Sequence, residues 1–255
     1  MKFLVIKKKN FWLAIVAILS MIVLSLDIGG GASASVFFGY APRLVPIYSV
    51  DTQEKKVAIS FDTAWGADKT LDIIKILEDY DVNATFFIVG FWVEKYPEMV
   101  KAINDQGIEI GTHSNTHPDF TTLSETQMEL ELSTSISHIE KITNKKVELF
   151  RAPYGAYNNT MLNLTDKMSL KTIQWDVDTL DWKGLSGLEI CERVMNKVKN
   201  GSIILCHNNS DHILDALPLM LERLLNAGYD VVSVGELIMH ENYYIDNLGI
   251  QRKQG

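Results

Sequence analysis

Short apolar segments alternate with longer amphipathic segments along most of the chain. The apolar segments are four to six residues long and rich in β-branched side chains, which predicts strands. They lie at 57–61, 84–89, 108–112, 147–150, 172–175, 202–206 and 231–234. The amphipathic segments, which predict helices, lie at 69–79, 97–106, 124–142, 158–167, 187–199, 213–226 and 234–240. Because a helix follows every strand, the pattern predicts a parallel sheet covered by helices, and at this length a closed or nearly closed α/β barrel.

The N-terminal region has a different pattern. Three consecutive lysines at 7–9 precede an uncharged apolar run from Phe11 to Leu26, and this run ends at Asp27. A basic flank before an apolar run predicts export across a membrane. Two interpretations remain open: the run is either a membrane anchor, for which it is slightly short, or a signal peptide cleaved near the small residues at 32–34. Both place the bulk of the chain outside the cytoplasm.

These patterns divide the chain into four parts. We predict a signal or anchor at 1–28, a linker at 29–56, a folded domain at 57–240 and a C-terminal tail at 241–255. The linker is indicated by its glycines and by Pro42 and Pro46.

The amino-acid composition limits the classes of protein to which the chain can belong. The chain has 255 residues, of which 47% are hydrophobic and 22% charged, as in globular proteins. Without the four lysines of the first nine residues, 20 basic residues face 32 acidic ones, which gives a net charge near −12. A body this acidic is a poor binder of nucleic acid. Cys191 and Cys206 have no metal-site spacing. We expect two buried thiols, with a single disulfide as the alternative.

Ionisable residues gather at the carboxyl ends of the predicted strands. They are Asp62 after the first strand, His113 and His117 after the third, Arg151 after the fourth, Asp176, Asp178 and Asp181 after the fifth, and His207 after the sixth. The carboxyl ends of barrel strands converge on one rim, so we expect these side chains in one site. Asp176 is left out of it, because strand alternation puts it out of phase with the others. The two histidines four residues apart are expected on one side of a helical turn, as in a metal site.

Five motifs, in order along the chain, resemble those of the polysaccharide deacetylases, the NodB-homology domains or family 4 carbohydrate esterases. The motifs are Ser60-Phe61-Asp62, His113-Ser114-Asn115-Thr116-His117, Arg151-Ala152-Pro153-Tyr154, Asp178-Thr179-Leu180-Asp181-Trp182 and Leu205-Cys206-His207. The resemblance covers about residues 55–240. It implies an irregular, TIM-like (β/α)7 barrel and hydrolytic N-deacetylation of an N-acetylated sugar.

The resemblance also implies a role for the ionisable residues. Asp62 would be the base that takes a proton from water, and His207 would be the acid that protonates the departing amine. Arg151 would hold Asp62 in its charged form. Asp178 would orient His207, within a motif that also carries Asp181.

The remaining motif residues would bind metal and substrate. His113 and His117 would hold a divalent metal ion, zinc or cobalt, which acidifies the water. The backbone N–H of Tyr154 would bind the oxyanion, and Pro153 before it would fix the local geometry. Trp182 and Leu205 would form the walls of the acetyl pocket.

One position departs from the family's pattern. The first motif usually has two adjacent aspartates, of which the second is a metal ligand, but here Thr63 follows Asp62. A neutral hydroxyl is a weak ligand for a divalent ion. Three outcomes are open: a metal held by two histidines and waters, completion of the site by Asp62 or Asp68, or catalysis that is lost or proceeds without metal.

Three functions of different classes follow. The leading hypothesis is an N-deacetylase of cell-wall peptidoglycan or a related polysaccharide. The departure at Thr63, with the N-terminal segment, resembles the sporulation-associated branch, which implies spore peptidoglycan as substrate. The second is a wall-glycan-binding or morphogenetic protein that keeps the fold without catalysis. The third, a glycosidase, would use Asp178 and Asp181 as paired carboxylates and leave His113, His117 and His207 without a role.

Overall fold

The computed structural model describes residue 9 and residues 12–13, 15–19 and 42–255. The chain divides into two compact units, Met1–Arg43 and Leu44–Gly255, and every element discussed below belongs to the second unit. Among the described residues, no helix combines the length and the apolarity needed to cross a membrane. The predicted apolar run at 11–26 lies largely outside the described residues, so the anchor and the signal peptide both stay predictions.

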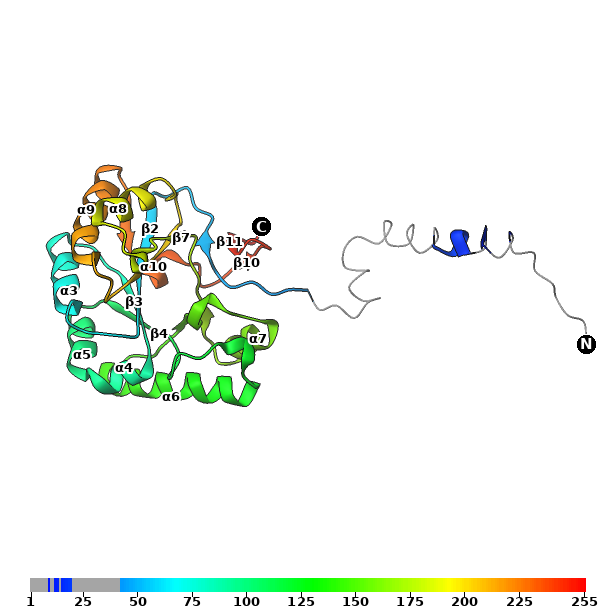
Figure 1. Cartoon of the computed structure of the whole chain (residues 1–255), viewed down its shortest axis with the longest axis horizontal. Helices are drawn as coiled ribbons and strands as arrows, with labels where there is room; N and C mark the ends of the chain where they lie inside the picture. The colour runs from blue at the N-terminus through cyan, green and yellow to red at the C-terminus, as the bar shows by residue number, and fades with distance from the viewer. Residues whose placement is uncertain (1–8, 10–11, 14, 20–41) are drawn as a thin grey trace, which may run out of the picture. The chain divides into compact units, whose positions relative to one another are not determined.

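Eight parallel strands form the main sheet of the second unit (Figure 1). They are β2 (Lys56–Thr63), β3 (Thr85–Ile88), β4 (Glu109–Thr112), β5 (Leu149–Phe150), β6 (Lys171–Thr172), β7 (Val177–Asp178), β8 (Ile203–His207) and β9 (Asp230–Val232). The order across the sheet is β6-β5-β4-β3-β2-β8-β7, and β9 pairs with the first half of β2. Seven of the eight residues of β2 are buried, so this strand is the centre of the sheet.

The sheet is a half-barrel of parallel strands and not a fully hydrogen-bonded barrel. Its edge strands β6 and β7 are joined by residues 173–176 alone. Extended backbone of this length reaches at most roughly 18 Å, so the two edges face each other across a gap. Ile47 lies against the edge of β6: its N–H donates to the Thr172 carbonyl and its own carbonyl accepts from the Gln174 N–H. The arrangement fits the expected (β/α)7 barrel, but closure by strand pairing is absent among the described residues.

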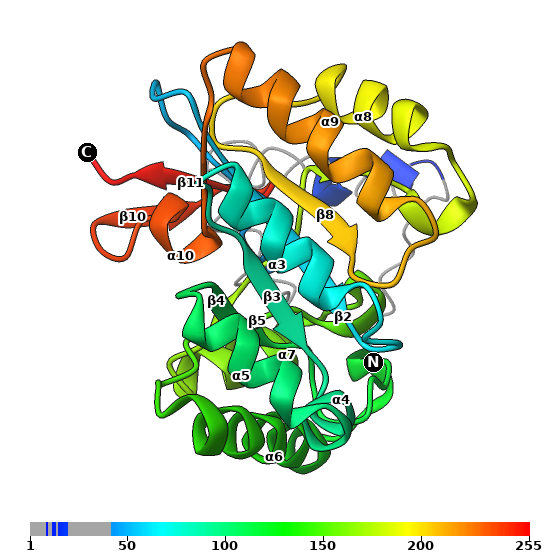
Figure 2. The ribbon, with the colours of Figure 1, turned by 90° about the vertical axis from the view of Figure 1, so that its left-hand side faces the viewer.

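The helices follow the predicted order. They are α3 (Thr70–Asp79), α4 (Gly90–Lys95), α5 (Pro97–Asp105), α6 (Glu125–Thr143), α7 (Asn159–Lys167), α8 (Gly187–Met195), α9 (Ile213–Asn226) and α10 (Val234–Leu237). Local signals set their ends: α6 begins at a capping box of Ser124 and Gln127 and ends at Asn144, which is left-handed. Figure 2 shows α3 across the middle of the sheet, with α8 and α9 on one side and α4, α5 and α6 on the other.

Some elements of the main sheet and its helices differ from the sequence prediction. The helix α4 was not predicted, because it is only six residues long and begins two positions after β3. The strand predicted at 172–175 exists as β6, but it ends at Thr172, where the chain crosses to β7 at the other edge of the sheet; β7 was not predicted.

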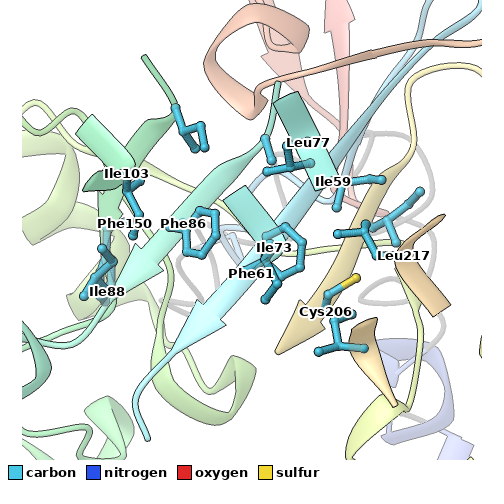
Figure 3. Close-up of a cluster of buried hydrophobic side chains, with 14 of the residues drawn as sticks. Ile59, Phe61, Ile73, Leu77, Phe86, Ile88, Ile103, Phe150, Cys206 and Leu217 are labelled. Atoms are coloured by element: carbon cyan, nitrogen blue, oxygen red, sulfur yellow. The ribbon is translucent and has the colours of Figure 1, made fainter. Parts of the chain in front are cut away.

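The hydrophobic core lies on both faces of the sheet. On the helix side, Phe61 and Phe86 stack with 4.8 Å between their ring centroids, beside Ile73 of α3 (Figure 3). A smaller cluster that includes Ala58 and Phe87 fills the inner face. Because side chains alternate along a strand, the outward Phe61 places the next residue, Asp62, on the inner side. Both cysteines are buried free thiols, as expected.

A second sheet joins the two ends of this unit. It has three strands in the order β1-β11-β10, namely β1 (Ser49–Val50), β10 (Tyr243–Ile245) and β11 (Ile250–Lys253). The end of the predicted linker at 29–56 and the predicted tail at 241–255 are therefore structured, and the compact unit begins at Leu44 rather than at residue 57. Strands this short carry too few alternations to be recognised from sequence.

Candidate active site

Asp62 and Arg151 form a buried ion pair at the carboxyl ends of β2 and β5. Arg151 Nη1 donates to Asp62 Oδ1 at 2.8 Å, and Arg151 Nη2 donates to the Gln174 carbonyl at 3.1 Å. The guanidinium carbon lies 4.1 Å from the centroid of the Phe87 ring. Burial by itself would raise the pKa of Asp62, but the neighbouring His113 and Arg151 hold it below its usual range. Asp62 is therefore ionised at neutral pH.

His113 and His117 lie next to each other beyond β4, with 4.9 Å between their ring centroids. His113 Nδ1 lies 2.8 Å from the Arg151 carbonyl oxygen, which accepts its proton. This tautomer leaves a lone pair on His113 Nε2, 3.5 Å from Asp62 Oδ2. Burial lowers the pKa of both imidazoles, that of His117 to about 4. Both rings are therefore neutral at pH 7, the state that binds metals.

The helical turn predicted for this histidine pair is wrong. Residues 113–117 form an irregular loop, because Ser114 (φ 74°) and His117 (φ 61°) both have left-handed backbone. The His117 N–H donates to Ser114 Oγ at 2.9 Å. The turns of this loop, and not the pitch of a helix, bring the two rings together.

His207 lies at the end of β8 and is paired with Asp181. Its Nδ1 lies 2.7 Å from Asp181 Oδ1, and its backbone N–H donates to Asp181 Oδ2 at 2.8 Å. Burial would lower the pKa of His207, but the hydrogen bond and charge of Asp181 outweigh it, and the pKa is raised. The pair therefore favours a protonated imidazole, which suits a general acid.

Asp178 does not orient His207 as predicted. Its Oδ1 accepts from the Leu180 N–H at 2.8 Å. Leu180 is left-handed (φ 53°), and the turn that it makes places Asp181 against His207 instead. Since both oxygens of Asp181 are engaged by His207, the structure gives no support to Asp178 and Asp181 as paired glycosidase carboxylates.

The residues predicted to contact substrate divide into buried and exposed ones. Pro153 and Leu205 are buried, whereas Tyr154 and Trp182 are 70% and 61% exposed. The Tyr154 ring packs edge-on against the His117 ring at 4.7 Å, so Tyr154 is part of the site. Trp182 follows Asp181 directly, and Leu205 precedes His207 by two positions on β8.

Trp65 was missed by the sequence analysis. Its ring lies 5.0 Å from that of His117 in an edge-on arrangement, and its side chain is 57% exposed. His117 therefore has exposed aromatic rings on two sides, Trp65 and Tyr154. A large aromatic residue just beyond the first motif was the available signal.

The donor set fits a divalent metal ion only in part. Thr63 is buried at the end of β2, and its Oγ1 has no hydrogen-bond partner. His117 Nδ1 is likewise buried without a partner. Within residues 42–255 and the other described positions, no three His, Cys, Asp or Glu side chains are placed to hold a metal ion. Two neutral imidazoles are thus available, but the third ligand position has only a hydroxyl.

Comparisons with known proteins agree on one family. The sequence pattern of the polysaccharide deacetylases matches residues 49–173. The structure resembles BA3943 of Bacillus anthracis, described as a CE4 family pseudoenzyme, with 36% identity, 78% of this chain and 69% of that chain covered, and a TM-score of 0.74. A mutant of BA3943 with restored enzymatic activity matches with the same TM-score and 37% identity, covering 78% and 72% of the two chains.

Two proteins of Bacillus subtilis are also similar. The solved structure of the peptidoglycan deacetylase PdaC is 34% identical, with 74% of this chain and 92% of that chain covered and a TM-score of 0.67. The uncharacterized protein YlxY is 31% identical over 193 residues, which are 76% of this chain. The matches span 60% of the full length of YlxY and 40% of that of PdaC.

Proposed function

We propose that this chain, which belongs to the polysaccharide deacetylase family (family 4 of the carbohydrate esterases), removes acetyl groups from N-acetylated sugars of peptidoglycan. The observation that carries the proposal is the placement of base and acid: Asp62 and His207 are register partners on the adjacent strands β2 and β8. Arg151 holds the first ionised and Asp181 favours protonation of the second. Amide hydrolysis needs these two opposite protonation states.

In the proposed reaction, Asp62 Oδ2 takes a proton from the water whose oxygen attacks the acetyl carbonyl carbon. The backbone N–H of Tyr154 donates to the oxyanion that develops. His207 donates the proton of Nε2 to the sugar nitrogen as the C–N bond breaks, which yields acetate and a free amine. Nε2 is the nitrogen available for this step because Nδ1 is engaged by Asp181.

His113 and His117 are the residues that would hold a divalent cation, zinc or cobalt. When bound, such an ion acidifies the attacking water and polarises the acetyl carbonyl. The Arg151 carbonyl fixes the His113 ring so that Nε2 faces Asp62, while the Arg151 guanidinium holds Asp62 itself. One buried arginine therefore orients both the base and a histidine.

Thr63 favours a second candidate function, a wall-glycan-binding or morphogenetic protein without catalysis. The usual acidic ligand is missing at this position, while the base and the acid are retained. BA3943, which this chain resembles, is described as a CE4 family pseudoenzyme, and a mutant of it is described as having restored enzymatic activity. In this candidate the rim still recognises glycan, with the exposed Trp65 and Tyr154 beside the site.

The proposed place of action is the cell wall, outside the cytoplasm. The basic and apolar pattern of residues 7–26 supports export, either anchored to the membrane or secreted. Spore peptidoglycan is the proposed substrate because the sequence resembles the sporulation-associated branch of the family.

Acetate release by the full chain tests both candidates. Purified peptidoglycan and N-acetylglucosamine oligomers are the substrates, with added zinc, cobalt or chelator. We expect release that metal stimulates and that Asp62→Asn and His207→Ala abolish. Thr63→Asp should raise release and lower the metal concentration required, because it restores an acidic ligand. Release from Thr63→Asp alone, with none from the wild type, would show that the wild type lacks catalysis and would support the second candidate.

A further inference from the structure

The loop from His113 to His117 is held from one side by the start of α4. The backbone N–H groups of Gly90 and Phe91 donate to the carbonyl oxygens of Ser114 and Asn115 at 2.9 and 3.1 Å. A Cβ atom at Gly90 would lie 2.1 Å from Asn115 Oδ1 and 3.1 Å from Asn115 Cα, so a larger residue at this position would displace the Asn115 side chain and crowd the loop backbone. The carbonyl groups of Ser114 and Asn115 are therefore held in place by hydrogen bonds from the backbone of α4.

The other side of the loop is held by one side chain, Glu131 of α6. Its Oε2 accepts from the backbone N–H groups of Asn115 and Thr116 at 2.9 and 2.8 Å, and its Oε1 accepts from the Thr116 hydroxyl at 2.6 Å. Two successive backbone N–H groups that point the same way form a concave site for an anion. A carboxylate fits this site because both of its oxygens accept hydrogen bonds.

We infer that Glu131 is a positioning residue for the histidine pair. The two left-handed residues of the loop, Ser114 and His117, have conformations that non-glycine backbone resists, so the loop needs outside contacts to keep its shape. Glu131 binds the two amides that lie between them. Because His117 follows Thr116 directly, a shift of these amides moves the His117 imidazole away from His113. Glu131 acts through the loop backbone and does not touch the reacting groups.

Amide hydrogen exchange, followed by NMR on the full chain, tests this role without requiring turnover. We expect Glu131→Ala to speed exchange of the Asn115 and Thr116 amides by about tenfold or more, because each loses its acceptor. The His117 ring resonances should shift, since this ring lies between Trp65 and Tyr154. Glu129→Gln, which alters an exposed glutamate on the same helix, is the matched control and should change neither signal.

A conservative variant sharpens the test. Glu131→Gln should give intermediate exchange rates, because its carbonyl oxygen still accepts from both N–H groups while its NH2 group donates to the Thr116 hydroxyl. Unchanged exchange and unchanged His117 resonances in Glu131→Ala overturn the inference. A lower thermal midpoint with intact loop signals overturns it too, because that result shows a contact that only stabilises α6.

Turnover is a second readout, and it rests on the proposed function. If the wild type releases acetate, Glu131→Ala should lower kcat by roughly 10–100-fold, with a smaller change in KM and a thermal midpoint near that of the wild type. An unchanged kcat in an active enzyme contradicts the inference. If the wild type releases no acetate, the proposed deacetylase activity fails, and the exchange experiment alone decides the role of Glu131.

Discussion

The parallel sheet has acidic side chains at both ends, and their pKa values are shifted in opposite directions at the two ends. At the carboxyl end, Asp62 is paired with the Arg151 guanidinium and lies near His113 and His207, and its pKa is lowered. At the amino end, Glu109 accepts from the Thr85 hydroxyl and the Gly235 N–H, and burial raises its pKa. Asp176, which was excluded from the site by sequence alternation, also lies at an amino end and has a raised pKa for the same reason.

The difference shows which contacts can keep a buried carboxylate charged. Neutral hydrogen-bond donors reduce the cost of burial at Glu109 but do not cancel it. At Asp62, the neighbouring His113, the charge and hydrogen bond of Arg151, and His207 together more than cancel it. The carboxyl end of the sheet is therefore suited to proton transfer, whereas the acids at the amino end bind neighbouring strands and loops together.

The strongest test of this comparison is Asp62→Asn. We expect acetate release to fall by about 10²–10⁴-fold, because the amide cannot act as the base. The unfolding free energy at pH 7 should fall by about 3–5 kcal/mol, since Arg151 is left buried without its counter-charge. The folded-state pKa of Asp62 is lowered, so its stabilisation exists above the ordinary aspartate pKa and is lost as the pH falls through the folded value. The loss in the variant should therefore shrink towards acid pH in urea unfolding.

Asp68→Asn is the matched control for that experiment. Asp68 is an exposed carboxylate in the connection between β2 and α3. The Asp68→Asn substitution should leave acetate release and the unfolding free energy near wild-type values. An equal effect of both substitutions would contradict the special role of the buried pair, and would point to completion of the metal site by Asp68.

A smaller effect on acetate release is expected from Asp181→Asn. This substitution tests His207, the proposed acid at the same end of the sheet. The pKa of His207 should fall, because the hydrogen bond and charge that outweigh its burial are removed. The alkaline limb of the pH–rate profile should then move to lower pH. Asp178→Asn should move it less, because Asp178 binds the Leu180 N–H and not the His207 ring. A larger shift in Asp178→Asn would restore the role first predicted for that residue.

The smallest effect is expected at the amino end, from Glu109→Gln. The folded-state pKa of Glu109 is raised, so its stabilisation is complete below the ordinary glutamate pKa and is lost as the pH rises through the folded value. The amide carries no such ionisation cost. From pH 4 to pH 8, the variant should therefore gain unfolding free energy relative to the wild type. Acetate release should not change.

Glu129→Gln, at an exposed glutamate of α6, controls for a general effect of net charge. It should leave the pH dependence of unfolding as in the wild type. If Glu109→Gln instead loses stability at every pH, Glu109 is needed as an ion, and the contrast between the two ends of the sheet is wrong.

Much of the site could be predicted because its residues follow strands that have clear patterns. Asp62, Arg151 and His207 each end an apolar strand, and parallel pairing brings strand ends to one rim. The partner of His207 could not be predicted in this way. Asp178 and Asp181 are both in the motif, and the left-handed turn at Leu180 decides between them. Such a turn depends on the packing of the whole loop and not on local preference.

The sequence by itself determined the alternation of strands and helices, the acidic character of the body, the rim residues and the family. Each of these features depends on a short segment or on a total count of residues, so the sequence is enough to predict it. The tertiary structure decided how far the sheet closes, how β10 and β11 return to β1, and how the His113–His117 loop is held. Glu131 and Gly90 reach that loop from different helices, α6 and α4. Contacts between segments far apart in the chain form only when the fold brings them together, so no local sequence pattern predicts them.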